Sequence, residues 1–354
     1  MFRYHYYLLV FLLSSFVECA YCQLTSETNM IRIGDSISCH RIEYFSPGGM
    51  GENQIWDFRD LEFLDDSDAV HFTCDSDSVM IFGLTPIYRQ KYIFQNDSLL
   101  MPGYETRLQT MDYSEPLTLF AYPCHYGYNT RQNFHGSGTY CKKYAIESQG
   151  IMETDADATG MILYNADDTL HNVLRIHRIY TSGVCQYLPS ARTADTLNVR
   201  QRIEEHYLWY ARGYRYPVFE TVSTTVFDDL TPVSCQQTAY CTSPSEQRLL
   251  GDSVNYDILL SDSLVQSLVE TAPPILYQVS VNGNQVEVSY TAETDVTVHA
   301  LVSDRMGLVY QRATSSCPAG GHASLLLNCN GLKQGVYILY LNVNGRVFSE
   351  KIDL

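Results

Sequence analysis

The chain has 354 residues, with 40 Asp and Glu side chains against 23 Lys and Arg, so its formal net charge is −17. Only 18% of the residues are charged, whereas Tyr and Phe number 28 and 14. This composition excludes a disordered acidic chain, because so many aromatic residues can bury a large core. It also excludes nucleic acid as a partner, since the acidic charge would repel the phosphate backbone.

The first 22 residues have the layout of a secretory signal peptide. Arg3 supplies a positive charge, residues 7–13 are apolar, and small residues lead to Cys22 and Gln23. The apolar run is shorter than the roughly 20 residues that span a bilayer, so we expect cleavage between Cys22 and Gln23 and export of the mature chain. A lipoprotein acylated at Cys19 or Cys22 is the alternative.

Residues 23–270 are predicted to form a large β-rich domain. Residues 173–180 alternate in polarity, and residues 218–226 are rich in β-branched side chains. Both patterns are typical of strands. Helical periodicity is visible only over residues 259–269.

Two adjacent prolines, Pro273 and Pro274, mark residues 271–275 as a linker. Residues 276–354 after it contain several short strand patterns, and residues 335–343 form a nearly continuous apolar run. Asn344 and Gly345 then predict a two-residue hairpin, because a type I′ turn needs positive φ at both positions. The sequence therefore predicts an all-β protein, in which a large β-rich domain precedes a small immunoglobulin-like β-sandwich.

Nine cysteines remain after Cys22, and in an exported chain several are expected to pair. The disulfide candidates are two close pairs, Cys317 with Cys329 and Cys235 with Cys241. Cysteine and histidine do not recur at zinc-finger spacing, so we expect no metal, and no motif indicates a cofactor.

The C-terminal segment resembles the sorting domain of proteins that the type IX (Por) secretion system of Bacteroidetes exports. The matching residues are Gly335, Val336, Tyr337, the hairpin residue Gly345, and Lys351 near the C-terminus. The resemblance implies recognition by the secretion machinery of the outer membrane, followed by release or by attachment to surface lipopolysaccharide. The protein is then expected at the cell surface or outside the cell, and in the periplasm if the sorting interpretation fails. Because few contacts should cross a Pro-Pro linker, residues 276–354 are expected to be a removable export module.

The larger segment resembles a group of uncharacterised exported proteins from the same bacteria. The shared features are a Trp-Asp-Phe signature at residues 56–58 and an aromatic stretch at residues 209–217. The side chains of Trp209, Tyr210, Tyr214 and Tyr216 form a candidate binding surface for a glycan or a protein, because aromatic rings combine a large contact area with a polar tip. Packing of the same rings in the core is the alternative.

No motif in the sequence matches the full residue pattern of a known catalytic or metal-binding site. Residues 155–160 imitate half of an EF-hand loop but lack its final acid, so we expect an acidic turn there. Ser137 lies between Gly136 and Gly138, which we expect to serve a tight turn rather than a nucleophile. The predicted function is thus an exported, non-catalytic binding or structural protein. A secreted hydrolase whose catalytic residues the sequence does not reveal is the alternative.

Overall fold

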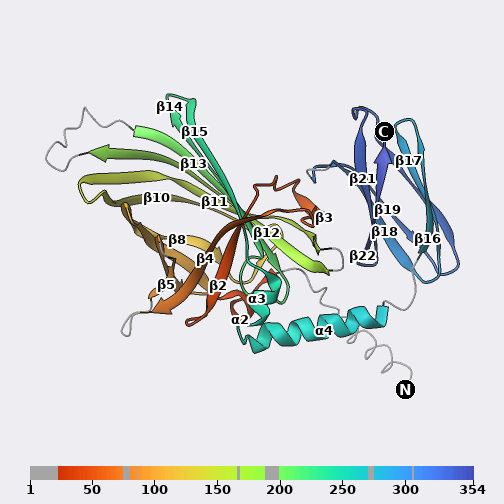
Figure 1. Ribbon diagram of the computed structural model, residues 1–354, viewed down its shortest axis with the longest axis horizontal. Helices are drawn as coiled ribbons and strands as arrows, with labels where there is room; N and C mark the ends of the chain where they lie inside the picture. Colours follow the sequence, from red (N-terminus) through yellow and green to blue (C-terminus); the bar gives the residue numbers. More distant parts are fainter. Residues whose placement is uncertain are drawn as a thin grey trace, which may run out of the picture.

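The computed structural model describes residues 23–74, 80–85, 87–165, 168–187, 199–269, 275–304 and 307–354. Most elements are β-strands, and they form a large N-terminal domain and a small C-terminal sandwich (Figure 1). The predicted all-β fold class is therefore confirmed. The predicted signal peptide, including Cys22, and residues 271–274 of the predicted linker lie outside the described residues, whereas Ile275 already opens the first strand of the sandwich.

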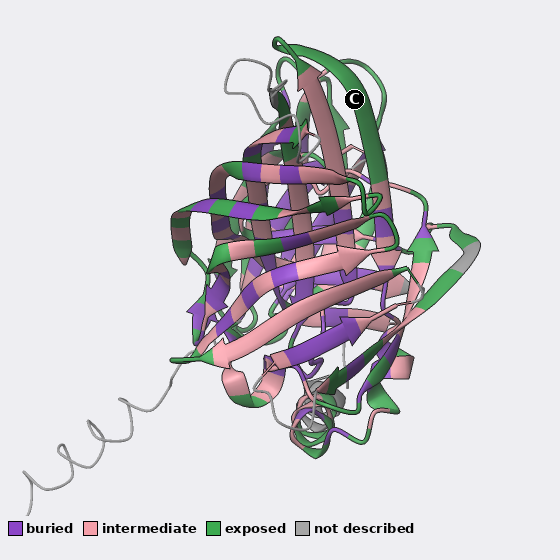
Figure 2. Ribbon diagram, turned by 90° about the vertical axis from the view of Figure 1, so that its left-hand side faces the viewer, coloured by how far each residue is buried: buried purple, intermediate pink, exposed green. Residues whose placement is uncertain are grey.

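Twelve of the thirteen strands in the largest sheet form one closed, barrel-like sheet. Their spatial order is β10 (Asn129–Tyr140), β8 (Gln109–Ala121), β7 (Ser98–Thr106), β6 (Tyr88–Gln95), β5 (Met80–Leu84), β4 (Phe63–Cys74), β2 (Ser36–Ile42), β15 (Thr231–Cys241), β14 (Phe219–Asp228), β13 (Val199–Ala211), β12 (Asp168–Tyr187) and β11 (Tyr144–Asn165). The sheet closes because β10 pairs with β11 as well as with β8. Neighbouring strands are antiparallel, so side chains alternate between the inside and the outside, and burial alternates along the strands (Figure 2).

Glycines allow the strands to approach closely where the sheet closes. A Cβ atom at Gly138 of β10 would lie 1.8 Å from the carbonyl oxygen of Thr110 on β8. One at Gly150 of β11 would lie 2.0 Å from the carbonyl oxygen of Thr181 on β12. Gly138 was expected in a tight turn, and this prediction is wrong: it lies inside β10, where a missing side chain makes room for a neighbouring backbone.

Short elements lie together at one end of the closed sheet. They are β1 (Gln23–Leu24), which pairs with β9 (Cys124–His125), and the helices α2 (Ser26–Asn29), α3 (Pro244–Arg248) and α4 (Ser253–Val269) (Figure 1). Helix α4 contains the helical segment predicted from the sequence. Within the described residues, none of the helices has the length and apolar character needed to cross a membrane.

A buried ion pair fastens this end of the domain. Arg215 donates hydrogen bonds to both carboxylate oxygens of Asp252, at 2.6 and 3.0 Å, and to the backbone carbonyl oxygens of Glu27 and Met30. These bonds connect the loop after β13 to the residue before α4 and to the N-terminal segment. Because both charges are buried and paired, removal of either one would leave a costly uncompensated charge.

Strands β11 and β12 continue into a second apolar core outside the closed sheet. There β3 (Gly51–Asp57) pairs with β11 in parallel, and five large aromatic side chains pack together: Phe45, Trp56, Phe58, Trp209 and Phe219. Buried Arg175 contacts this core and donates two hydrogen bonds to Asp157, at 2.9 and 2.7 Å. The acidic turn predicted over residues 155–160 is therefore wrong, because this segment is strand and Asp157 holds a buried arginine.

The C-terminal domain is a sandwich of seven antiparallel strands. One sheet contains β16 (Ile275–Asn282), β17 (Gln285–Ala292) and β20 (His322–Asn328), and the other contains β19 (Val309–Cys317), β18 (Val296–Ser303), β21 (Val336–Val343) and β22 (Arg346–Asp353). The φ angles of Asn344 and Gly345 are 51° and 93°. The predicted type I′ hairpin is thus confirmed.

The two domains are in contact through side chains. Ile55, Met161 and Leu163 of the N-terminal domain pack with Leu301 and Tyr340 of the sandwich. The Tyr340 hydroxyl also donates a hydrogen bond of 3.0 Å to the carboxylate of Asp57. More than a linker therefore joins the two domains, in contrast to the few contacts that the two prolines led us to expect.

Candidate binding cavity

The closed sheet surrounds a cavity of about 910 Å³. An eight-stranded sheet closes around a space that side chains can fill, and a twelve-stranded one encloses a wider interior. The inward-facing side chains of this sheet leave part of that interior open. A volume of this size falls in the range of pockets that hold small organic ligands.

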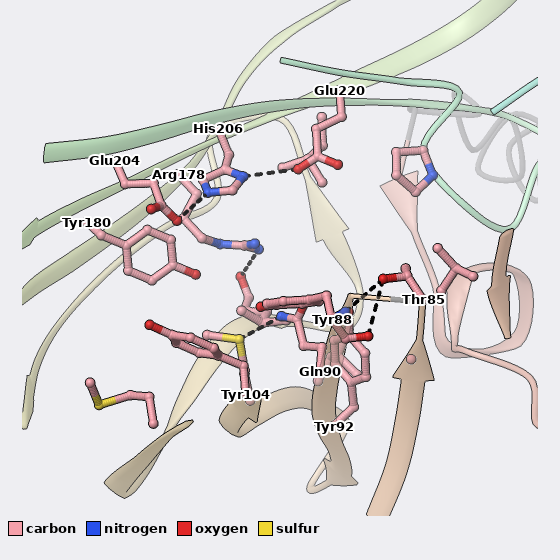
Figure 3. Close-up of a pocket in the computed structure, with 18 of the residues that line it drawn as sticks. Thr85, Tyr88, Gln90, Tyr92, Tyr104, Arg178, Tyr180, Glu204, His206 and Glu220 are labelled. Carbon is pink, nitrogen blue, oxygen red and sulfur yellow. Dashed lines mark hydrogen bonds and ion pairs between the residues drawn. The ribbon is translucent and has the colours of Figure 1, made fainter. Parts of the chain in front are cut away.

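Tyrosine dominates one wall of the cavity (Figure 3). The residues that line the cavity include seven tyrosines: Tyr88, Tyr92, Tyr104, Tyr113, Tyr180, Tyr210 and Tyr216. Burial raises the pKa of each, so all seven carry a neutral hydroxyl that can donate a hydrogen bond. Apolar residues such as Leu99, Met101, Met111 and Phe134 line other parts of the cavity.

Several of these hydroxyls have no hydrogen-bond partner among the residues that the structure describes. Within the described residues, no hydrogen bond is formed by the hydroxyls of Tyr88, Tyr92, Tyr113 and Tyr210, whereas that of Tyr104 accepts one from Gln109 at 2.7 Å. These hydroxyl oxygens are not among the fully buried unpaired atoms, so they are accessible from the cavity, where a ligand or water can form their hydrogen bonds.

A histidine held by two carboxylates forms the charged part of the wall. His206 Nε2 lies 3.0 Å from Glu204, and its Nδ1 lies 3.0 Å from Glu220 on the neighbouring strand (Figure 3). Burial opposes the charge of the imidazole, but the hydrogen bonds to both carboxylates outweigh it and raise the pKa of His206 to about 9. Burial likewise opposes ionisation of Glu204, yet its contacts with His206 and Arg202 lower the pKa of this carboxyl to about 2.

These protonation states suit charge stabilisation rather than proton transfer. At neutral pH His206 is a cation with both ring nitrogens engaged, so it has no free lone pair to act as a base. Glu204 is ionised, whereas the general acid of a hydrolase needs a raised pKa. Within the described residues, no three His, Cys, Asp or Glu side chains are arranged to hold a metal ion.

Arg178 is the most buried charge of the cavity wall that has no carboxylate partner. Its residue is 7% exposed, and its guanidinium donates hydrogen bonds to Thr154 Oγ1 at 3.2 Å and to the carbonyl oxygen of Leu119 at 2.9 Å. Both acceptors are neutral. In the described part of the chain, the neighbouring carboxylates Glu204 and Glu220 form their ion pairs with His206 and Arg202 instead.

The predicted aromatic binding surface is wrong as an exposed surface, because all four side chains are buried. Trp209 lies in the aromatic core outside the closed sheet, and Tyr214 packs near α4 and bonds to Arg248. The other two, Tyr210 and Tyr216, line the cavity. Packing in the core, the alternative interpretation, thus describes all four rings, of which Tyr210 and Tyr216 also line the cavity.

Neither predicted disulfide is present in the structure. All nine described cysteines are free, and Cys317 and Cys329 are buried as thiols in the core of the sandwich. Cys235 and Cys241 lie on the same strand, β15, six residues apart. A strand extends by about 3.3 Å per residue, which places them roughly 20 Å apart and makes a bridge impossible.

The five predicted sorting residues lie together in the last hairpin of the sandwich. Gly335 pairs with Leu354 through two backbone hydrogen bonds. The ring of Tyr337 packs in the core of the sandwich, and its hydroxyl donates a hydrogen bond to the carbonyl oxygen of Lys333. Val336, Gly345 and Lys351 are exposed. Of the five residues, only Tyr337 is therefore buried. Of the predicted cleavage site, Gln23 opens β1 and Cys22 is not described.

The charged cluster was not identified in the sequence, although one signal for it exists. Arg202, Glu204 and His206 occupy every second position of β13 and share one face. In an open sheet such a face is read as solvent-exposed, and only closure of the sheet turns it inward.

The chain matches no protein-family model, and no curated protein is similar to it in sequence. The assignment of the site therefore rests on its geometry alone.

Proposed function

We propose that the N-terminal domain binds a small amphipathic molecule in the cavity of the closed sheet. The observation that carries this proposal is a cavity of about 910 Å³ whose wall combines apolar side chains with tyrosine hydroxyls that have no partner among the described residues. Such a wall offers apolar contact to most of a ligand and hydrogen bonds to its polar groups. The protein is a binder in this proposal and not a hydrolase, because His206 is a cation with both ring nitrogens engaged and Glu204 is ionised, which does not suit acid–base catalysis at the cavity wall.

The ligand proposed from the structure differs from the one proposed from the sequence. A cavity inside the closed sheet favours a small molecule over a folded protein or an extended glycan chain, for which an exposed aromatic surface would be needed. It admits a single small molecule.

A neutral fluorescent probe, 1-aminoanthracene, tests the proposal. We expect saturable binding to one site, with increased fluorescence in an apolar environment. Ser182 lines the cavity, and Thr181, its neighbour on β12, is exposed on the other face. Ser182→Phe should therefore weaken binding of the probe by placing a ring in part of the cavity, and the matched control Thr181→Phe should leave it unchanged. Equal binding by both variants would place the probe outside the cavity and refute the proposal.

We also propose that the binder is exported, by the predicted signal peptide and the C-terminal sandwich. Support comes from a terminal hairpin whose outer strand, β22, exposes Lys351 and Glu350 to an outer-membrane receptor. A fusion of residues 275–354 to a passenger behind a signal peptide should reach the cell surface in a host that has the type IX system. Retention of that fusion in the periplasm would refute the sorting role while leaving the binding role intact.

A further inference from the structure

Resting on the proposed binding function, we infer that the cavity selects an apolar monocarboxylate, whose carboxylate pairs with Arg178. Three observations carry this inference: the missing counter-charge of Arg178, the charge balance of the cluster around it, and the hydroxyl groups that face it.

Arg178 has the position of an anion-binding residue. On β12 it lies between Thr154 of β11 and His206 of β13, its direct neighbours across the sheet. A buried guanidinium with only neutral acceptors pays a large desolvation cost that an anion would offset. Its planar set of five donors, of which Nε and Nη2 bind Thr154 and Leu119, also matches the geometry of a carboxylate.

The charge of the cluster limits the ligand to a single negative charge. Within the cluster, three cations, Arg178, Arg202 and His206, lie with two carboxylates, Glu204 and Glu220, so one positive charge remains uncompensated. Two further cations line the cavity: Arg215, which pairs with Asp252, and Arg200, which is exposed. A monoanion would neutralise the uncompensated charge of the cluster. A dianion such as a phosphate monoester would leave the cluster with one excess negative charge. Such an unpaired charge is costly in a site with low dielectric constant.

Neutral hydroxyls supply the remaining ligands of the carboxylate. Tyr180 lies two residues from Arg178 on the same face of β12. The hydroxyls of Tyr92, Tyr180 and Tyr210 belong to side chains that line the same cavity as Arg178. Those of Tyr92 and Tyr210 have no other partner among the described residues. They would donate to a carboxylate bound at Arg178, while the apolar part of the ligand contacts Met101, Met111 and other apolar side chains of the cavity wall.

Three ten-carbon probes that differ only in charge test this inference: decanoate, 1-decanol and decylammonium. Each is titrated by displacement of 1-aminoanthracene from the full mature chain. We expect decanoate to bind at least tenfold more tightly than 1-decanol, and decylammonium to bind most weakly. In Arg178→Gln the affinity for decanoate should fall at least tenfold and that for 1-decanol should change less than twofold.

A second pair of variants covers the case in which Arg178→Gln does not fold. Ser182→Asp introduces a carboxylate four residues further along β12, on the same face and in the same cavity as Arg178, without removing Arg178, and it should erase the preference for decanoate. Thr181→Asp places the same charge on the outer face and should preserve the preference.

The failures of the two proposals are distinguishable. Equal affinity for decanoate and 1-decanol in the wild-type protein, or an unchanged preference in a folded Arg178→Gln or Ser182→Asp variant, would overturn the carboxylate inference alone. Failure of 1-aminoanthracene itself to bind would overturn the proposed function together with it.

Discussion

Protonated His206 is expected to stabilise the folded protein, and the effect should disappear at alkaline pH. The pKa of this histidine rises from 6.5 to about 9 on folding. Each unit corresponds to about 1.4 kcal/mol, so the stabilisation amounts to roughly 3 kcal/mol. Because the folded-state pKa lies above the unfolded one, this contribution is fully present below pH 6.5 and is lost as the pH rises to about 9.

The assay is urea unfolding at pH values from 5.5 to 10, comparing the wild-type chain with His206→Gln. The free energy of unfolding of the wild type should decline by roughly 3 kcal/mol more than that of the variant between pH 6.5 and 9. His177→Gln is the control, since His177 lies on the opposite face of β12 and contacts Glu205 instead of the cavity cluster. It should keep the wild-type decline. A decline of equal size in His206→Gln would show that the histidine is not held as a cation between the two glutamates.

Three further predictions concern the framework. Gly138→Ala should destabilise the domain by about 1–3 kcal/mol in urea unfolding, because its Cβ would meet a backbone oxygen at 1.8 Å. The control Gly335→Ala should be near neutral, since no atom lies within 4 Å of its Cβ. Equal effects of the two substitutions would contradict this prediction. Tyr340→Phe should cost about 1–3 kcal/mol by removing the hydrogen bond to a carboxylate between the domains, and an unchanged unfolding curve would mean that the domains are not joined there. Peptide mapping of oxidised protein should find no bridge between Cys235 and Cys241 within one chain, and such a bridge would contradict their placement on β15.

Local signals made the C-terminal sandwich predictable from the sequence. Alternating polarity, a long apolar run and the turn residues Asn344 and Gly345 each specify short-range structure, and all three agree. The Pro-Pro segment likewise indicated where the sandwich begins to within one residue. The contacts of Tyr340 and Leu301 with the other domain were not predictable, since they depend on how two folded surfaces meet.

The cavity could not be predicted, because closure of a sheet is a long-range property. It depends on the pairing of β10 with both β8 and β11 and on the number of strands in the circle, neither of which has a local pattern. Without closure, the alternating charges of β13 indicate a surface, and the aromatic residue Tyr210 indicates either surface or core. The sequence did indicate that this tyrosine-rich stretch was unusual, and half of its four singled-out aromatic side chains do line the cavity.

Nuclear magnetic resonance of methionine methyl groups tests the cavity as the binding site most directly. Met101 and Met111 line the cavity and are 4% and 2% exposed, whereas Met50 is 72% exposed on the outside. With ¹³C-labelled methionine methyl groups and saturating decanoate, our account predicts shifted signals and nuclear Overhauser contacts to the ligand chain for Met101 and Met111, and an unchanged signal for Met50. Contacts confined to Met50, or no change at either buried methionine while decanoate is bound, would contradict it.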